Sequence, residues 1–365
     1  MLKIALKFLR KINSYGYKSY IVGGFVRDYL LGIDSKDIDI ATNATPKQIK
    51  KIFGGLCLSN EYCGSVTVIM RGVCFQVTTF RKELAYVNNR KPCEIEYIDD
   101  LYEDLLRRDF VINTLCMDEN GSIIDYLGGK ADLNRRIIRT VGNSYQKFSE
   151  DSLRILRAIR FATILDFSLA DDVKKSIIKT KYLLNNLSYF RKKCELEKIF
   201  TSLNYKKGIK LLLELGLEKE LELSNLSKLL DYGAISLIGI WSVLDASKNY
   251  PFNKNELFLI QMVKEVMPLN NLDPIVLYKY GLYVNSVAAE LKNLDKKELT
   301  STYNDLVIKS RADINITASD IMKLLHKGEG NYLKIIYEDI EREILYCRLE
   351  NDTKDISKYI LHKYE

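Results

Sequence analysis

The chain has 365 residues, of which 47% are hydrophobic and 28% are charged, with a formal net charge of +7 at pH 7. This length exceeds one usual domain, so two or more structural units are expected. No apolar run is long enough to span a membrane, which predicts no membrane association. The positive charge permits a nucleic-acid partner without demonstrating one.

The seven cysteines are scattered and include no Cys-x-x-Cys pair, and the histidines are His326 and His362. This combination predicts no zinc and a reducing compartment, the cytoplasm. The amphipathic start of the chain, residues 1–10, fits an opening helix better than a signal peptide. A signal peptide needs a longer apolar centre and a small-residue cleavage site.

The first expected strand, residues 20–22, leads into the motif Gly23-Gly24-Phe25-Val26-Arg27-Asp28. Glycines expose backbone N–H groups to an anion because no Cβ stands in the way. Arg27 adds a planar fork of donors that suits phosphate oxygens. A Gly-Gly pair alone is usually a turn, but this motif is a candidate phosphate cradle.

The second expected strand, residues 37–41, carries Asp37 and Asp39. Alternation along a strand puts both carboxylates on one face and Ile38 and Ile40 on the other. Two hard oxygen donors suit Mg²⁺ when substrate phosphates complete its shell. An Asp-x-Asp pair is more often a solvated strand face, yet beside a phosphate cradle it predicts equipment for phosphoryl transfer.

The next elements predict an α+β unit with a small, mixed, mostly antiparallel sheet and helices. Thr45-Pro46 is an N-cap with proline at N1 and opens a helix through Phe53. Residues 65–70 and 73–80 form a predicted hairpin around Arg71-Gly72, and residues 94–98 form a further strand. From Ser149 onward the periodicity is helical, and this change from mixed α/β to all-helical pattern predicts a domain boundary near residue 145.

Arg107-Arg108-Asp109 stands directly before an apolar run. One interpretation is surface charge at the start of a helix. The functional interpretation is that Arg108 meets a triphosphate while Asp109 accepts a hydrogen bond from a ribose hydroxyl.

The helical part opens with the run Glu150-Asp151-Ser-Leu-Arg154-Ile-Leu-Arg157-Ala-Ile-Arg160. Its plain interpretation is a helix capped by Ser149 with internal ion pairs. A second interpretation concerns bases, because cytosine and adenine present an amino donor beside a ring acceptor, and guanine and uracil reverse that order. Asp151 accepting from the amino group beside Arg154 donating to the ring nitrogen would select C and A and reject G and U.

Six motifs resemble, in order, those of the class II tRNA nucleotidyltransferases, the CCA-adding enzymes, and of their bacterial poly(A) polymerase relatives. These motifs are residues 23–32, 37–39, 77–81, 107–110, 125–129 and 150–154. The resemblance covers the first 165 residues strongly and the remainder weakly. It implies a nucleotidyltransferase head over residues 1–145, followed by an all-α neck with a base-selecting helix (146–200), body (201–270) and tRNA-binding tail (271–365).

The resemblance also implies an activity and roles for individual residues. The activity is Mg²⁺-dependent addition of CMP, CMP and AMP from CTP and ATP to the tRNA 3′ end, without a nucleic-acid template. Asp37 and Asp39 would be the catalytic and metal-binding residues. The nucleotide would be bound by residues of the other motifs: Gly24, Arg27, Arg108, Asp109, Asp151, Arg154, Arg157 and Arg160.

One position departs from the family pattern. Gln76 stands where the family usually has a glutamate, directly before Val-Thr-Thr-Phe-Arg. A neutral amide is a poorer metal ligand, which leaves a non-catalytic RNA-binding homologue as an alternative. Residues 81–106 resemble the flexible loop of CCA-adding and A-adding enzymes, which disfavours a CC-only enzyme. An A-adding enzyme and a poly(A) polymerase stay open.

Overall fold

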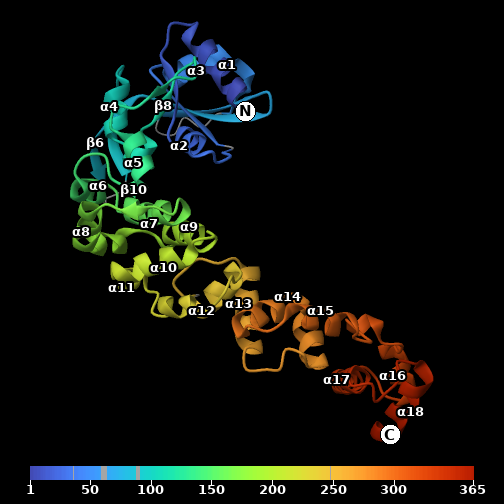
Figure 1. The fold of residues 1–365 in the computed structure, drawn as a ribbon. Coiled ribbons are helices and arrows are strands. Elements are labelled where there is room, and N and C mark those ends of the chain that lie inside the picture. The colour runs from blue at the N-terminus through green and yellow to red at the C-terminus, as the bar shows by residue number, and fades with distance from the viewer. Residues whose placement is uncertain (36, 59–63, 88–90, 247) are drawn as a thin grey trace. The chain divides into compact units, whose positions relative to one another are not determined.

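The computed structural model describes the chain except for residues 36, 59–63, 88–90 and 247, and for residues 84–87 and 91–94 it describes the backbone only. The chain divides into two compact units, Met1–Leu226 and Ser227–Glu365 (Figure 1). The expected boundaries near residues 145, 200 and 270 stay predictions.

A seven-stranded sheet lies in the first unit, in the order β3-β4-β5-β2-β1-β8-β9. β2 and β5 pair in parallel, and the other neighbours pair antiparallel. The prediction of a small, mixed, mostly antiparallel sheet is therefore confirmed. The strands are β1 (Ser19–Val22), β2 (Ile38–Thr42), β3 (Cys57–Leu58), β4 (Ser65–Met70), β5 (Val73–Thr79), β8 (Cys116–Met117) and β9 (Ile123–Ile124).

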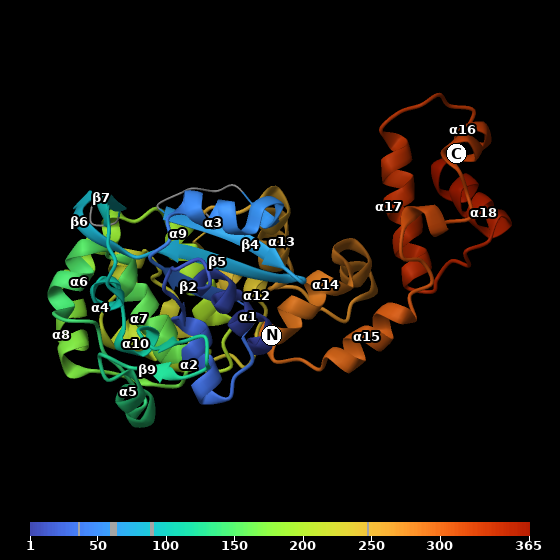
Figure 2. The same cartoon turned by 90° about the horizontal axis from the view of Figure 1, so that it is seen from above.

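One face of this sheet packs on helices α1 (Leu2–Asn13) and α3 (Pro46–Phe53) (Figure 2). Phe8 of α1 stacks on Phe53 of α3 at 4.4 Å between ring centroids and on Phe75 of β5 at 4.2 Å. Ile38 is the register partner of Phe75, so it shares this face. Asp39 is the next residue and therefore lies on the opposite face.

The local signals in this part of the chain act as predicted. Thr45 and Gln48 form a reciprocal capping box at the start of α3. The hairpin β4–β5 turns at Arg71 and Gly72, with φ values of 53° and 75°. Two successive positive φ angles give a turn whose twist matches the flanking strands.

Residues 81–106 are more regular than the expected loop. β6 (Arg81–Val87) and β7 (Lys91–Tyr97) pair as an antiparallel ribbon, and α4 (Leu101–Leu106) follows. α4 packs its apolar side on the face of the sheet that carries Asp39, in a buried cluster of Val22, Ala41, Phe80, Leu101, Leu105 and Cys116.

The helix expected to begin at Ser149 is two helices. α6 (Ser144–Glu150) ends at Asp151, and α7 (Leu153–Ile164) begins after Ser152. The prediction that Ser149 caps a helix is therefore wrong, because its hydroxyl donates to the Tyr145 carbonyl within α6 (2.9 Å). The helix that carries Arg154 is α7, whose N-cap is Ser152 without a side-chain cap, and α6 is capped by Asn143, whose side chain accepts from the Gln146 N–H.

The rest of the first unit is mostly helical, as predicted. A short parallel pair, β10 (Ile137–Ile138) with β11 (Ser168–Leu169), interrupts it. The other helices of this unit are α2 (Gly24–Leu31), α5 (Gly129–Arg135), α8 (Asp171–Thr180), α9 (Tyr189–Phe200), α10 (Tyr205–Glu214) and α11 (Glu218–Leu221).

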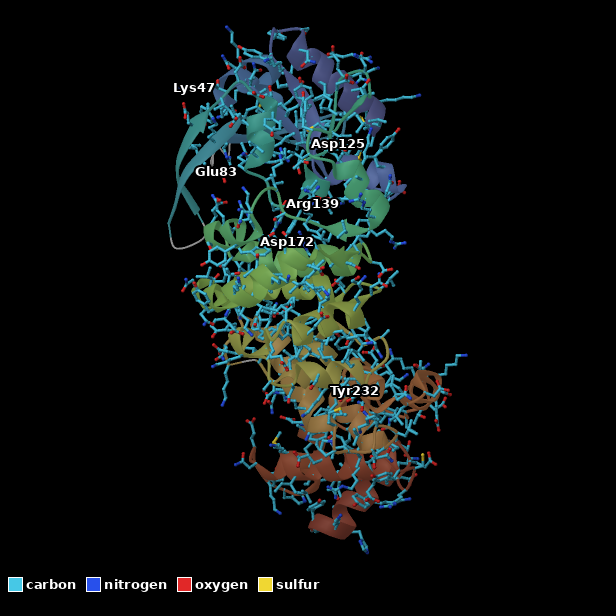
Figure 3. All side chains as sticks on the ribbon, turned by 60° about the vertical axis from the view of Figure 1, so that its left-hand side comes forward. Lys47, Glu83, Asp125, Arg139, Asp172 and Tyr232 are labelled. Atoms are coloured by element: carbon cyan, nitrogen blue, oxygen red, sulfur yellow. The ribbon has the colours of Figure 1, made fainter. Side chains whose placement is uncertain are left out.

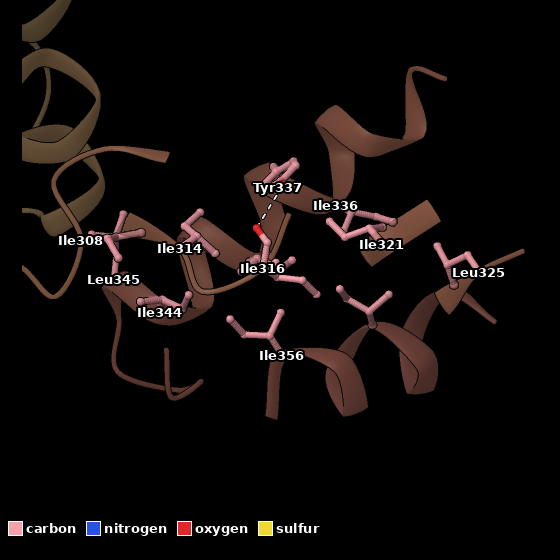
Figure 4. Close-up of a cluster of buried hydrophobic side chains, with 12 residues drawn as sticks. Ile308, Ile314, Ile316, Ile321, Leu325, Ile336, Tyr337, Ile344, Leu345 and Ile356 are labelled. Carbon is pink, nitrogen blue, oxygen red and sulfur yellow. Dashed lines mark hydrogen bonds between the residues drawn. The ribbon is translucent and has the colours of Figure 1, made fainter. Parts of the chain in front are cut away.

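The second unit is helical over its described residues. Its C-terminal core is a cluster of isoleucines and leucines around Tyr337, whose hydroxyl donates to the Ile316 carbonyl at 3.2 Å (Figure 4). No helix among the described residues has the length and apolar character needed to cross a bilayer. The helices are α12 (Leu237–Leu244), α13 (Lys254–Val266), α14 (Pro274–Lys292), α15 (Lys296–Asn304), α16 (Ala318–Leu324), α17 (Tyr332–Leu345) and α18 (Thr353–Tyr364).

Candidate active site

A cavity of about 600 Å³ opens in the first unit on the sheet face that carries Asp39. Its walls come from the start of α2, strand β2, the residues after α4, and the beginning of α7. The volume lies within the range of small-molecule sites. Sequence positions more than a hundred residues apart thus meet here, including these predicted site residues: Gly24, Arg27, Asp37, Asp39, Arg108, Asp109, Asp151, Arg154 and Arg157.

Asp37 and Asp39 both line this cavity. Partial burial raises the pKa of Asp39; Arg108 opposes that rise and Asp37 adds to it. Two carboxylates that open into one cavity form an oxygen donor set that suits Mg²⁺, and a bound cation would relieve their repulsion. Among the described residues they are not part of any group of three or more His, Cys, Asp or Glu that could hold a metal ion. Substrate phosphates would therefore have to supply further ligands.

The start of α2 forms one wall of the cavity. Gly23 is the N-cap, with φ 73° and ψ −131°, a conformation that disfavours any residue with a side chain. A Cβ on Gly23 would lie 3.5 Å from Arg108 Nη1 and 3.9 Å from Asp39 Oδ2. The first N–H groups of a helix have no intrahelical acceptor, so this end of α2 attracts anions.

Arg27 is held in place by two side chains. Its Nη1 donates to Asn113 Oδ1 at 2.7 Å, and its Nη2 lies 2.7 Å from Asp28 Oδ1. Asn113 in turn donates to Asp109 Oδ1 at 3.2 Å. The guanidinium is therefore oriented before any ligand arrives, which reduces the entropy lost on binding phosphate.

Asp109 forms an ion pair with Arg157 of α7. Its Oδ2 accepts from Arg157 Nε at 2.8 Å and from Nη2 at 2.5 Å, while its Oδ1 accepts from the Phe110 N–H. Burial works to raise the pKa of Asp109, but Arg157 and these hydrogen bonds together hold it well below its ordinary value. A ribose hydroxyl would have to share this carboxylate with Arg157.

Asp151 and Arg154 lie at the break between α6 and α7. Asp151 Oδ1 accepts from the Leu153 N–H at 3.1 Å, and burial raises the pKa of Asp151 despite the nearby Arg154. Arg154 Nη1 donates to Glu150 Oε2 at 2.8 Å and to the Lys147 carbonyl at 3.0 Å. Its Nη2 donates to the Arg107 carbonyl at 3.3 Å. Both side chains line the cavity.

Arg160 differs from the other predicted site residues. It is not among the described residues that line the cavity. Its Nε lies 3.0 Å from Glu195 Oε2 of α9. The nucleotide contact expected of Arg160 therefore stays a prediction, and in this structure its guanidinium pairs with Glu195.

Gln76 is exposed and is the register partner of Asp39 on the neighbouring strand, so the two side chains share a face. Its Oε1 accepts from Thr67 Oγ1 at 2.8 Å. Gln76 does not line the cavity, whereas Thr78, two residues further along β5, does.

Sequence reasoning missed other residues that line the cavity. Ser65 and Thr78 are register partners that share a 2.9 Å hydrogen bond. The period-two spacing of Thr78 from Gln76 could have revealed Thr78, and the hairpin register could have revealed Ser65. Glu83, at the base of the ribbon β6–β7 (Figure 3), and Asn113 had no such signal. The contacts of both depend on tertiary packing.

Three protein families match separate parts of the chain. Residues 19–139 match the poly A polymerase head domain, and residues 252–360 match the putative domain 2 of tRNA nucleotidyltransferase. Residues 166–225 match a family described as the probable RNA- and SrmB-binding site of polymerase A. The first of these matches contains Asp37, Asp39 and the phosphate cradle.

Relatives extend over nearly the whole chain. A CCA-adding enzyme from Bacillus pumilus is 33% identical over 98% of this chain and 96% of its own length. One from Bacillus subtilis is 32% identical over 98% and 97%. The crystal structure of the Bacillus stearothermophilus CCA-adding enzyme in complex with CTP is similar, with a TM-score of 0.89 and 28% identity, covering 98% of this chain and 96% of that chain.

Proposed function

We infer that this chain, which belongs to the CCA-adding enzyme family of nucleotidyltransferases, adds CMP, CMP and AMP to the tRNA 3′ end from CTP and ATP. The observation that carries this inference is that one cavity is lined by Gly24 and Arg27, which would bind phosphate, by the carboxylates of Asp37 and Asp39, and by Asp151 and Arg154, which would read the base. Nucleotide addition without a nucleic-acid template requires triphosphate binding, phosphoryl transfer and selection of the base by the protein.

Phosphoryl transfer is the task of Asp37 and Asp39 in this proposal. They would hold Mg²⁺, which when bound would activate the tRNA 3′-hydroxyl and neutralise charge on the phosphates. The hydroxyl oxygen bonds to the α-phosphorus of the nucleotide, and the bond to pyrophosphate breaks. No covalent enzyme intermediate is needed. The start of α2, Arg27 and Arg108 bind the triphosphate and align it for attack.

Base selection is the task of Asp151 and Arg154. The Asp151 carboxylate accepts from the amino group of cytosine or adenine, and Arg154 donates to the adjacent ring nitrogen. Glu150 and two carbonyls fix the guanidinium of Arg154, so its donors cannot turn to suit guanine or uracil. A wrong base leaves buried polar groups unpaired, which is a large penalty.

Arg157 and Asp109 contribute to the sugar and phosphate side of the pocket. Arg157 reaches the cavity from α7 while its charge is balanced by Asp109. The other carboxylate oxygen of Asp109, Oδ1, already accepts from the Asn113 side chain and the Phe110 N–H. The Asp109–Arg157 pair is therefore held in place before a nucleotide binds. We propose that it receives the ribose hydroxyls.

The RNA partner is bound by shape and charge. The tail, residues 271–365, is the proposed tRNA-binding part and overlaps the match to the putative domain 2 of tRNA nucleotidyltransferase, while the match described as a probable RNA-binding site covers residues 166–225. A protein that acts on tRNA fits the net charge of +7. The cysteines whose side chains the structure describes are free thiols, which supports the proposed cytoplasmic location.

An extension assay tests the proposed function. Purified protein is incubated with Mg²⁺, CTP and ATP and with tRNA that lacks its terminal CCA. Three added nucleotides are expected. Addition of A alone, and only to tRNA ending in CC, would identify an A-adding enzyme. Long A tails would identify a poly(A) polymerase.

Gln76 favours the second candidate, a non-catalytic RNA-binding homologue. Such a protein would bind tRNA but add no nucleotide, and Gln76→Glu would restore addition by supplying a third carboxylate beside Asp39. In the proposed enzyme the unmodified protein is active, and Gln76→Glu lowers the Mg²⁺ concentration needed for half-maximal rate. A Mg²⁺ titration of both proteins distinguishes the two candidates.

A further inference from the structure

We propose that Asp104 is a positioning residue that aims Arg108 into the nucleotide site and ties it to the ribbon β6–β7. Asp104 lies in α4, is fully buried, and is not among the described residues that line the cavity. It therefore acts through its partners and not by contact with substrate. The inference rests on the proposed function.

The carboxylate of Asp104 holds two adjacent arginines. Its Oδ1 accepts from Arg107 Nε at 2.8 Å, and its Oδ2 accepts from Arg108 Nη2 at 3.2 Å. The Nε of Arg108 is buried and makes no hydrogen bond within the described structure. The position of the Arg108 guanidinium thus depends strongly on Asp104.

The same carboxylate also reaches the ribbon. Asp104 Oδ1 accepts from the backbone N–H of Arg81, the first residue of β6, at 3.2 Å. A second link runs beside it, because Glu83 Oε1 accepts from Arg81 Nη2 at 2.9 Å and from Arg107 Nη1 at 3.3 Å. A displacement of the ribbon at its base would therefore shift the side chains of both Arg107 and Arg108.

The connection continues to the base-reading side of the site. The carbonyl of Arg107 accepts from Arg154 Nη2. The carboxylate of Asp104 therefore contacts the proposed phosphate-binding residue Arg108 directly. It also contacts Arg107, whose carbonyl anchors the proposed base-reading residue Arg154. A purely stabilising ion cluster would share these contacts, so the test must separate positioning from stability.

The decisive measurement is the equilibrium dissociation constant for CTP, with melting temperature measured in parallel. Asp104→Asn replaces one carboxylate oxygen by an amide N–H₂ that faces an arginine donor. We expect CTP binding to weaken by roughly tenfold, the size of one charged hydrogen bond. The variant Asp104→Glu keeps the charge but displaces both oxygens, and it too should weaken CTP binding.

A double-mutant cycle shows whether Asp104 acts through Arg108. Arg108→Lys removes the planar fork, so adding Asp104→Asn to it should cost little more. Fully additive losses would overturn the proposal, as would unchanged CTP affinity in Asp104→Asn or Asp104→Glu.

The matched control is Asp339→Asn in the second unit. Asp339 is a buried carboxylate that accepts from Lys363, Tyr359 and Tyr364. The Asp339→Asn variant should have a lower melting temperature than the wild type but the same CTP affinity. Because CTP binding is measured without turnover, a wild-type protein that adds no nucleotide would contradict the proposed function and still leave the role of Asp104 tested.

Discussion

Asp37 and Asp39 show how far a residue can be interpreted from its neighbours in the sequence. Strand alternation correctly placed Asp39 on the face opposite Ile38 and Ile40. Asp37, expected within the same strand, lies just before β2, and both carboxylates line the cavity. The sequence could not show that Gly23 lies beside both Arg108 and Asp39. Gly23 and Arg108 are 85 residues apart along the chain, so only the tertiary fold brings them together.

Removing one of the two proposed metal-binding carboxylates should impair catalysis much more than tRNA binding. Asp39→Asn is expected to lower kcat for CMP addition by roughly a thousandfold or more, since metal stabilisation of the transition state contributes several kcal/mol. Affinity for tRNA should stay unchanged. Single-turnover incorporation and a filter-binding assay measure the two quantities.

Asp34→Asn is the control for that experiment. Asp34 is exposed and does not line the cavity, so its rate should equal that of the wild type. Equal losses in both variants would remove Asp39 from its proposed role.

Substitution of Gly23 by alanine should reduce CTP affinity more than the same substitution at another glycine with positive φ. Gly23→Ala forces a side chain into a strained conformation beside Arg108 and Asp39, so both stability and nucleotide affinity should fall. Gly16→Ala shares the positive φ but has no atom within 4 Å of the new Cβ. It should lose about 1 kcal/mol of stability and bind CTP normally. CTP binding that falls equally in both variants would contradict the role of Gly23.

At the scale of elements, the break between α6 and α7 is the feature that sequence reasoning missed. The run from Glu150 to Arg160 has helical spacing, so one continuous helix was the simpler interpretation. The chain instead ends α6 at Asp151 and begins α7 at Leu153. Arg154 and Asp151 still lie one turn apart, because the Arg154 N–H donates to the Asp151 carbonyl.

The ion pair between Asp109 and Arg157 connects the segment after α4 with α7, and it predicts a dependence of stability on pH. The pKa of Asp109 is lowered in the folded protein. Its stabilising contribution is therefore present above the unfolded pKa of about 4 and is lost as pH falls toward the lowered folded value. Asp109→Asn should cost roughly 2 kcal/mol at pH 7, and less as the pH falls below 4.

Urea unfolding of wild type and Asp109→Asn at pH 7, 4 and 3 checks this dependence. The control is Asp166→Asn, which removes an exposed pair with Lys207 and should change little at any pH. A difference between wild type and Asp109→Asn that is constant from pH 7 to 3 would contradict the assignment.

For the whole molecule, composition and motif order were sufficient to predict the fold class. The mixed sheet with helices, followed by a helical remainder, agrees with the similar crystal structure. Helical periodicity alone could not locate the division at Leu226–Ser227, because helices on both sides have the same pattern. The ordered ribbon β6–β7 was also missed, since only residues 94–98 carried a strand signal.

The central claim is that protein side chains, and not a nucleic-acid template, select the bases. It is tested most directly by sequencing the ends of tRNA extended by wild type and by Arg154→Ala in an equal mixture of all four nucleoside triphosphates. We predict CCA ends for wild type and frequent G or U for Arg154→Ala. Equal use of all four nucleotides by wild type, or undiminished selection of C and A by Arg154→Ala, would contradict it.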